Sequence, residues 1–457
     1  MPSLFAGASS SGQLLESMSF AGFSYPEAIE IKPLSRPPNA TVRVPGSKSI
    51  TNRALVMAAL FGKDRPCFLE NCLKSEDTEV MVSSLQALGF QIDVNWSLGT
   101  ASVAGRSDGN RIPVDKAELF VGNSGTTMRF LSAMVCLGHG RYRLDGIPRM
   151  RERPIGDLLA ALQQLGVNAI SERNDGCPPV VVQTDGLPGG KLTIRGKVSS
   201  QFLSGLLLAA PYARDDVGIE IQGPMVSRPY VEMTLGMMDD WGLPVIRNAA
   251  KSSFRVSGRQ RPVGGMRYWV EPDATAASYF FAAAALAPGQ IAVSRLNRKS
   301  LQGDVVFVDV LEKMGCQVDR RAGSIIVQGA PLHGINVDMN DISDTVMTLA
   351  AVACFAEGPT TIRNVAHIRH KETDRLTALA AELRRVGAGV EEFADGLTII
   401  PRPLHGAEIE TYNDHRMAMS MALIGLKVPG IVIKNPGCVA KTYPGFFDDL
   451  EKLRGSG

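Results

Sequence analysis

Apolar and polar positions along the chain recur with a period of about 70 to 76 residues. Each period begins with a helix start rich in Ser, Asp or Asn. A helix rich in Ala, Leu and Met follows, then a strand, a polar connection and a second helix. A Gly after the second helix, typical of a left-handed C-cap, leads into a further strand. Six such units fit the sequence, so the pattern predicts a repeated α/β unit.

The predicted starts of the first helices share a side chain that can accept a hydrogen bond from a free backbone N–H. They are Ser47-Lys48-Ser49, Asn123-Ser124-Gly125-Thr126, Ser199-Ser200-Gln201, Asp273-Ala274-Thr275, Ser343-Asp344-Thr345 and Asn413-Asp414-His415. The predicted C-cap glycines are Gly89, Gly166, Gly242, Gly315 and Gly387. Chance recurrence of ordinary α/β turns is the alternative, and the similar spacing of these glycines counts against it.

Units that mix helices with strands favour packing around a few shared cores over an open solenoid. Six units suggest two domains of three units, with a crossing near the stretch from Gly264 to Pro272. The strand before Lys48 must then enter the other half, so the chain crosses twice and forms a hinge. The predicted parts are an extension, loosely ordered, at residues 1–26, one domain at residues 48–270, and a second domain at residues 27–47 plus 271–457.

Composition is that of an ordinary protein in water, with 457 residues, 45% apolar and 21% charged side chains and a net charge of +2. No field of one sign favours nucleic acid or a membrane surface as a partner. The 7 cysteines show no CxxC spacing, which predicts buried thiols in a reducing, cytoplasmic location. No apolar run approaches the roughly 20 residues of a membrane span. The single HxxH pair, His367 and His370, has no third ligand nearby in sequence, so we expect no metal.

The stretch from Pro45 to Arg53 indicates an anion site. Pro45-Gly46 ends an alternating strand, and Ser47 or Ser49 can cap the helix that follows. Lys48 and Arg53 then lie where free N–H groups and the helix dipole already favour an anion. The stretch is not a nucleotide-binding P-loop, because Ser rather than Gly precedes Lys48. A capped helix with a solvated basic first turn is the alternative.

Two further basic segments precede predicted second helices. Arg149-Met150-Arg151-Glu152-Arg153-Pro154 places three arginines before a Pro, a residue favoured at the first helical position. Arg369-His370-Lys371-Glu372-Thr373-Asp374-Arg375 opens the helix that ends near Arg385, and we expect Lys371 and Arg375 to share a face of it. Basic residues in a first turn oppose the helix dipole unless an anion compensates, although ion pairs on a solvated helix are an alternative.

Converging helix starts would gather these cations in one cleft, together with Arg416 and Lys441. Such a cleft predicts substrates with several negative charges, because arginine forks fit carboxylate and phosphate oxygens. Asp344 and Glu372 lie among the cations and are candidate proton donor and acceptor. The alternative for Asp344 is a simple N-cap.

Taken together, several of these segments resemble the 5-enolpyruvylshikimate-3-phosphate (EPSP) synthase family, in the same order and at similar spacing. They are residues 45–53, 123–129, 149–156, 199–202, 371–375 and 412–419. The pairing of Lys-Glu-Thr-Asp-Arg with Asn-Asp-His-Arg-Met-Ala-Met is more specific than any single motif. The resemblance implies an α/β fold of the two-domain inside-out α/β barrel type, with three pseudo-symmetric βαβαββ repeats in each domain and the active site in the interdomain cleft.

The resemblance also implies transfer of the enolpyruvyl group of phosphoenolpyruvate to the 5-hydroxyl of shikimate 3-phosphate, with release of phosphate, in aromatic amino acid biosynthesis. It implies no metal, no cofactor and no macromolecular partner, and a monomer. The implied catalytic residues are Lys48, Asp344 and Glu372. The implied shikimate 3-phosphate ligands are Lys48, Ser49, Arg53, Ser199, Ser200, Gln201, Ser227, Tyr230, Asp344, His367 and Lys371. The implied phosphoenolpyruvate ligands are Lys48, Gly125, Arg153, Gln201, Arg375, Arg416 and Lys441.

Two positions depart from the pattern of the family. His367 stands where an Asn often contacts the substrate, and Phe130 follows Arg129 where Pro is frequent. Opposed dipole ends and cations should also hold the two halves apart, so we expect binding of shikimate 3-phosphate to drive closure.

Three other functions remain as alternatives. The sister transferase that acts on UDP-N-acetylglucosamine typically carries a reactive Cys on the loop over the pyruvyl site, and residues 148–154 contain none. A non-catalytic anion-binding repeat protein would not need Glu372. An RNA-phosphate cyclase on the same repeat would be expected to have a nucleotide-binding loop and a basic surface.

Overall fold

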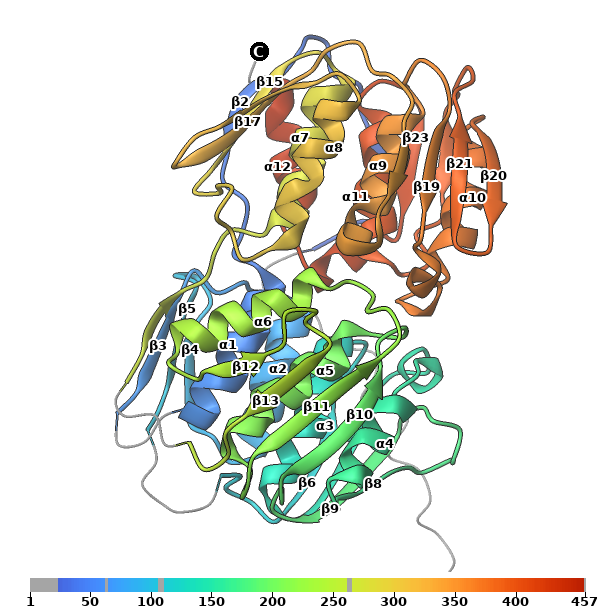
Figure 1. Cartoon of the computed structure of the whole chain (residues 1–457). Helices are drawn as coiled ribbons and strands as arrows, with labels where there is room; N and C mark the ends of the chain where they lie inside the picture. The colour runs from blue at the N-terminus through green and yellow to red at the C-terminus, as the bar shows by residue number, and fades with distance from the viewer. Residues whose placement is uncertain (1–23, 62–64, 106–110, 261–264, 456–457) are drawn as a thin grey trace, which may run out of the picture.

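The computed structural model describes residues 24–61, 65–105, 111–260 and 265–455, which form two lobes stacked end to end (Figure 1). Most of the predicted extension, residues 1–23, lies outside the described residues. Residues 24–26 of this extension are described, and the Tyr25 hydroxyl donates a hydrogen bond to the carbonyl of Pro444 at 2.8 Å. Tyr25 is therefore fixed against the C-terminal lobe.

The lower lobe of Figure 1 is built from three βαβαββ repeats. The first comprises α1 (Lys48–Phe61), β3 (Cys67–Glu70), α2 (Glu76–Ala87), β4 (Ile92–Asn95) and β5 (Thr100–Val103). The second comprises β6 (Lys116–Phe120), α3 (Gly125–Met134), β7 (His139–Asp145), α4 (Gly156–Gln164), β8 (Asn168–Ser171) and β9 (Val180–Asp185). The third comprises β10 (Gly190–Arg195), α5 (Ser200–Ala209), β11 (Val217–Gln222), α6 (Pro229–Asp240), β12 (Val245–Arg247) and β13 (Ser253–Val256).

The upper lobe repeats the same order of elements. Its first repeat comprises α7 (Ala274–Leu286), β15 (Gln290–Ser294), α8 (Phe307–Lys313), β16 (Gln317–Arg320) and β17 (Ser324–Gln328), whereas β14 (Arg267–Trp269), which precedes α7 in the chain, lies in the lower lobe. The second comprises β18 (Asn336–Asp338), α9 (Val346–Ala353), β19 (Thr360–Arg363), α10 (Arg375–Arg385), β20 (Gly389–Phe393) and β21 (Gly396–Ile400). The last comprises β22 (Ala407–Ile409), α11 (His415–Gly425), β23 (Ile431–Lys434) and α12 (Phe446–Lys452), and β1 (Ala28–Ile31) and β2 (Asn39–Val42) join this lobe from the start of the described chain.

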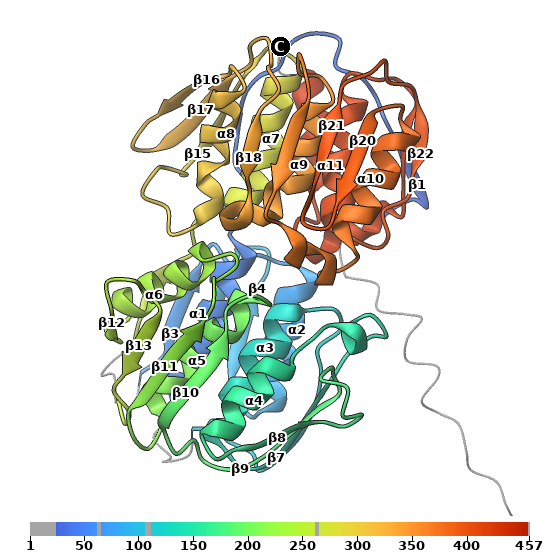
Figure 2. The same ribbon diagram turned by 45° about the vertical axis from the view of Figure 1, so that its right-hand side comes forward.

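The described residues form six small sheets, five with four strands and one with three. In each four-stranded sheet a parallel pair is followed by an antiparallel hairpin, as in the order β6-β7-β9-β8. The first helices of the repeats pack against one another, α1 and α5 on α3 in one lobe and α7, α9 and α11 in the other. The sheets surround these helices (Figures 1 and 2), which confirms the expected inside-out arrangement.

The two lobes exchange strands where the chain crosses between them. β2 pairs in parallel with β15 of the upper lobe, although α1, which follows it, belongs to the lower lobe. β14 pairs in parallel with β3 of the lower lobe, although α7, which follows it, belongs to the upper lobe. The crossings lie side by side, because Ser47 N donates to Glu271 O and Asp273 N donates to Pro45 O, both at 2.8 Å. The prediction that the strand before Lys48 enters the other half is confirmed.

Two separate hydrophobic cores correspond to the two lobes. One contains buried residues from Ile50 to Val270, and the other contains Ile31, Val44 and residues from Ala274 to Leu453. Each core is enclosed by its own sheets, so the lobes meet mainly through polar helix starts and loops. The cleft between them is therefore a place for polar chemistry.

The local signals at the ends of helices are confirmed for most repeats. Ser124, Ser199, Asp273 and Asp414 cap α3, α5, α7 and α11, and the five predicted C-cap glycines have φ between 67° and 116°. Two predictions were wrong. Pro154 does not occupy the first helical position, because α4 begins at Gly156. Lys371 does not lie on a helix with Arg375, because Asp374 caps α10 and the helix begins at Arg375.

Candidate active site

Starts of first helices from both lobes meet at the junction. Two adjoining pockets there are lined by residues at the starts of α1, α3, α5, α7, α9 and α11, namely Lys48, Thr126, Ser200, Thr275, Asp344 and Arg416. Because helix N-termini carry free N–H groups and partial positive charge, this crevice favours anions.

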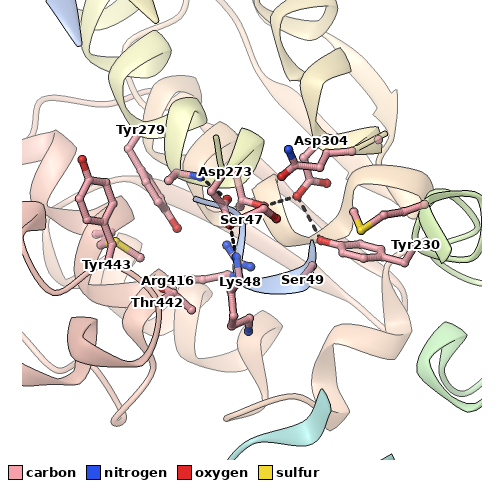
Figure 3. Close-up of a pocket in the computed structure, with 16 residues that line it drawn as sticks. Ser47, Lys48, Ser49, Tyr230, Asp273, Tyr279, Asp304, Arg416, Thr442 and Tyr443 are labelled. Carbon is pink, nitrogen blue, oxygen red and sulfur yellow. Dashed lines mark hydrogen bonds between the residues drawn. The ribbon is translucent and has the colours of Figure 1, made fainter. Parts of the chain in front are cut away.

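Most of the residues that the resemblance implies as shikimate 3-phosphate ligands line one of these pockets, together with Arg153. Its lining residues include Lys48, Ser49, Arg153, Ser199, Ser200, Gln201, Ser227, Tyr230, Asp344, His367 and Lys371. The second pocket contains Arg416 and shares Lys48, Ser49 and Tyr230 with the first (Figure 3). Segments separated by more than 300 residues of sequence, from Lys48 to Arg416, therefore contribute to one crevice.

Asp344 is surrounded by three cations from two segments. Its carboxylate lies 2.8 Å from Arg416 Nη2, 3.2 Å from Arg375 Nη1 and 3.6 Å from Lys371 Nζ. Burial raises the pKa of Asp344, but these cations outweigh burial and hold the pKa well below its ordinary value. The N-cap alternative is wrong, because the residue before α9 is Thr345 and no side chain caps that helix.

Glu372 lies beside Arg375, which also contacts Asp344. Its Oε2 accepts a hydrogen bond from Arg375 Nη2 at 2.8 Å, and its Oε1 lies 3.9 Å from Arg153 Nη1. Burial raises the pKa of Glu372, but Arg375, Arg153 and Lys441 hold it well below its ordinary value. Arg375 is itself fixed by Asp414, whose Oδ2 lies 2.7 Å from Nε. Both candidate acid–base carboxylates are therefore ionised at neutral pH.

A serine cluster lies opposite these carboxylates. Ser199 caps α5, and Ser227 has a left-handed φ of 49° at the turn into α6. The Ser227 hydroxyl lies 3.1 Å from His367 Nε2 and 3.1 Å from Ser343 Oγ, both in the upper lobe. Burial, with help from Lys371, lowers the pKa of His367 to about 3, so the imidazole is neutral. Neutral hydroxyl and imidazole groups at a helix start are suited to binding a phosphate.

Tyr230 reaches from α6 to two carboxylates of the upper lobe, of which Figure 3 shows Asp304. Its hydroxyl lies 3.0 Å from Asp344 Oδ2 and 3.1 Å from Asp304 Oδ2. Burial and the neighbouring charge of Asp344 raise the pKa of Asp304 to about 6. Asp304 was not predicted from the sequence, where it is one acidic residue in a short turn.

Arg53 lies behind the crevice rather than in it. Its Nη1 donates to Ser49 O at 2.8 Å and its Nε donates to Thr234 Oγ1 at 2.7 Å, and burial lowers its pKa to about 10. The guanidinium carbon lies 5.0 Å from the ring centroid of Phe130. The departure at Phe130 thus provides a cation–π contact to Arg53.

Gly125 begins α3 directly beneath two arginines. A Cβ atom at this position would lie 2.6 Å from Arg129 Nη1 and 2.6 Å from Arg153 Nη2. The Nε atoms of both arginines are buried and have no hydrogen-bond partner in the described structure. The absence of a side chain at Gly125 therefore leaves room beside two incompletely satisfied cations.

The sequence model of the EPSP synthase (3-phosphoshikimate 1-carboxyvinyltransferase) family matches residues 34–450. The chain belongs to the EPSP synthase family. It is 52% identical over 422 residues to a 3-phosphoshikimate 1-carboxyvinyltransferase of Nostoc punctiforme, covering 92% of this chain and 98% of the relative. A relative of the same name from Trichormus variabilis is 49% identical over 430 residues, covering 94% and 100%.

An EPSP synthase structure from Acinetobacter baumannii shares the fold, with a TM-score of 0.78 at 24% identity over 93% of this chain and 98% of that one. The family resemblance and the two-domain α/β fold inferred from the sequence are confirmed. The relatives described above bear the name of a 3-phosphoshikimate 1-carboxyvinyltransferase, not of a UDP-sugar transferase or an RNA-phosphate cyclase.

Besides Asp304, a second acidic residue at this crevice was missed by the sequence analysis. Asp77, in the first turn of α2, lies 2.7 Å from Lys441 Nζ and 3.1 Å from Lys48 Nζ. Burial raises the pKa of Asp77, but the two lysines outweigh burial and lower it. The sequence signal was Ser75-Glu76-Asp77 at the start of a second helix, the position at which Lys371 and Arg153 were singled out.

Among the described residues, no group of three or more His, Cys, Asp or Glu side chains is arranged to hold a metal ion. No helix in the described part of the chain is both long and apolar enough to cross a membrane.

Proposed function

We propose that this protein transfers the enolpyruvyl group of phosphoenolpyruvate to the 5-hydroxyl of shikimate 3-phosphate and releases phosphate. The observation that carries the proposal is the meeting of Lys48, Arg153, Lys371 and Arg416 with two carboxylates in one interdomain crevice. Two small, multiply charged substrates need such a set of cations, and family membership supports their identity.

The binding roles follow the two sides of the crevice. Ser199, Ser200 and Ser227 hold the 3-phosphate, with Gln201 and Tyr230 against the ring. Ser49 faces the carboxylate of shikimate 3-phosphate, with Arg53 behind it, while Asp344, His367 and Lys371 face its hydroxyls. Phosphoenolpyruvate lies beside Gly125, held by cations and one amide, namely Lys48, Arg153, Gln201, Arg375, Arg416 and Lys441.

Catalysis proceeds by addition and elimination. Protonation of the methylene carbon makes C2 electron-poor, the 5-hydroxyl adds there, and the tetrahedral adduct loses a proton and phosphate. Glu372, Asp344 and Lys48 exchange these protons, and the arginines stabilise the departing phosphate. Bound phosphoenolpyruvate shares Arg375 and Arg153 with Glu372, which weakens their hold on the carboxylate and raises its pKa toward that of a proton donor.

Phosphate release from phosphoenolpyruvate, measured with and without shikimate 3-phosphate, tests the proposed reaction. We expect release only when both substrates are present, and a loss of about 10²- to 10⁴-fold in kcat for Glu372→Gln. Release that does not depend on shikimate 3-phosphate would contradict the substrate assignment. Full turnover by Glu372→Gln would contradict the proton-transfer role and favour a different acid.

We also propose that residues 48–270 and residues 27–47 plus 271–457 are the two domains, because each hydrophobic core draws on one of these sets. The enzyme acts as a cytoplasmic monomer. Free, mostly buried cysteines support a reducing compartment, and each domain has a core of its own.

A further inference from the structure

Arg149 makes a contact between the lobes that the reaction described above does not use. It precedes the short 3-10 turn Met150–Glu152, in the loop that joins β7 to α4 of the lower lobe. Its Nη2 donates to the carbonyl of Lys371 at 3.0 Å, and its Nε donates to the carbonyl of Glu372 at 3.1 Å. One guanidinium therefore holds two consecutive carbonyls of the opposite lobe.

The segment it holds carries two residues of the proposed site but belongs to no helix or strand. Lys371 follows the 3-10 turn Ala366–His370 with φ −88° and ψ −149°, and α10 begins only at Arg375. A segment of this kind lacks the repeating hydrogen bonds that fix a side chain on a helix or strand. The orientation of Lys371 and Glu372 consequently depends on contacts made from outside.

The same loop of the lower lobe holds Glu372 at two points. Arg149 binds its carbonyl, while Arg153 lies 3.9 Å from its carboxylate. Glu152 anchors Arg149 from the solvent side, with Oε2 2.7 Å from Nη1. All of these contacts between Arg149 or Arg153 and Glu372 cross the junction, so they exist only when the lobes are together.

We propose that Arg149 is a positioning residue that couples closure of the lobes to the placement of Lys371 and Glu372 against the substrate. The inference rests on the proposed role of Glu372 in proton transfer. Arg149 does not touch the substrates in this scheme; it fixes the peptide from which both reactive side chains extend. A planar fork with two donors in fixed directions is better suited to this task than a flexible lysine ammonium.

The first experiment compares Arg149→Met, Arg149→Lys and Arg151→Met. Arg151 is the matched control, because it lies in the same turn but pairs within its own lobe, 2.8 Å from Asp145. We expect Arg149→Met to lower kcat by about 10- to 100-fold, the effect of a misplaced catalytic group. Arg149→Lys should recover part of this loss, and Arg151→Met should retain wild-type kcat.

Shikimate 3-phosphate affinity and the melting temperature separate positioning from a general structural role. The serines proposed to hold the 3-phosphate lie in the lower lobe and only the hydroxyl contact of Lys371 is disturbed, so Arg149→Met should lower this affinity much less than it lowers kcat, and the melting temperature should stay close to wild type. A parallel loss of kcat, affinity and melting temperature, or an unchanged kcat, would overturn the inference.

A double-mutant cycle with Glu372→Gln asks whether Arg149 acts through Glu372. If it does, adding Arg149→Met to Glu372→Gln should cost far less than it costs the wild type. Losses that multiply would overturn the inference. If Glu372→Gln retains full turnover, the proton-transfer role of Glu372 fails, and this inference fails with it. If Glu372→Gln is inactive while Arg149→Met has wild-type turnover, the positioning role alone fails.

Discussion

Replacing Gly125 by Ala should selectively weaken the use of phosphoenolpyruvate. The new methyl group would lie 2.6 Å from Arg153 Nη2, 2.6 Å from Arg129 Nη1 and 3.0 Å from Arg153 Cζ. Non-bonded heavy atoms prefer separations of about 3.5 Å or more, so one or both guanidinium groups must retreat by nearly 1 Å.

Neither arginine is free to move without loss. Arg153 Nη1 donates to Asn123 O at 3.1 Å, and Arg129 donates to Gly125 O at 3.2 Å and to Pro154 O at 3.1 Å. A misplacement of about 1 Å at a catalytic group costs up to about 100-fold. We therefore expect kcat/KM for phosphoenolpyruvate to fall about 10- to 100-fold, roughly 1.4 to 3 kcal/mol of transition-state stabilisation.

The effect on folding should be small. Ala in a helix is favoured over Gly by about 0.5 to 1 kcal/mol, which offsets part of the clash. The serines proposed to bind the 3-phosphate are not displaced, because they lie on α5 and at the start of α6. Melting temperature and shikimate 3-phosphate affinity should therefore remain near wild type, while affinity for small anionic analogues of phosphoenolpyruvate falls with that of the substrate.

Steady-state phosphate release at saturating shikimate 3-phosphate measures this effect. Gly156→Ala, at the start of the neighbouring helix α4, is the matched control, because a Cβ there would meet only Gly176, with Cα at 3.4 Å and O at 3.7 Å, which are ordinary contacts. An unchanged Michaelis constant for phosphoenolpyruvate together with unchanged analogue affinity in Gly125→Ala would refute the placement of this substrate beside Arg153.

Three further predictions concern Asp304, Ser227 and the closure of the lobes. Because burial and Asp344 raise the pKa of Asp304 to about 6 from 3.8, the folded state binds this proton more tightly, and the free energy of unfolding should fall as pH rises between these values. Thermal scans should show this slope flattened in Asp304→Asn, and equal slopes would contradict it. Ser227→Ala, which removes a hydroxyl 3.1 Å from His367, should weaken shikimate 3-phosphate binding about tenfold by calorimetry, whereas the exposed Ser83→Ala should not; equal affinities would count against the phosphate site. Small-angle scattering should show compaction when shikimate 3-phosphate binds, and an unchanged radius of gyration would argue against ligand-driven closure.

Much of the fold could be predicted because its signals are local. An Asp or Ser one residue before an apolar run, as at Asp273 and Ser199, caps a helix through a hydrogen bond to a backbone N–H two or three residues away. The period of these signals revealed the repeats, and the number of repeats revealed the two lobes. None of these inferences needed a tertiary distance.

The errors arose where two local signals competed. The spacing of Lys371 and Arg375 fits one helical face, but Asp374 between them accepts a hydrogen bond from Thr377 N and begins the helix later. Pro154 has the fixed φ of a first helical residue, yet Arg153 and Pro154 remain in the loop, with Arg153 lining the crevice. In both places the residues left outside the helix are ones that we propose to bind substrate or to transfer protons.

Contacts such as those of Asp77 and Arg149 could not be predicted, because nothing in their own segments indicates the partner. Asp77 resembles any acidic residue in a first turn, where the helix dipole alone favours it. Its pairing with Lys441 joins residues 364 positions apart, and the hydrogen bonds of Arg149 end on carbonyls, which every residue has.

Counting cations in the sequence overstated the free positive charge of the cleft, because several of these cations are paired with carboxylates. The cations with the fewest carboxylate partners indicate where a bound anion would be most stabilising. Arg375 is matched by Asp344, Glu372 and Asp414, and Lys441 by Asp77. Within the described part of the chain, by contrast, Arg129 has no ion pair, Arg153 has only the 3.9 Å contact to Glu372, and both have an unsatisfied buried Nε. Since an uncompensated buried charge is costly, these two arginines gain most from a bound anion. They flank Gly125, so the missing side chain and the missing negative charge coincide at the position proposed for phosphoenolpyruvate.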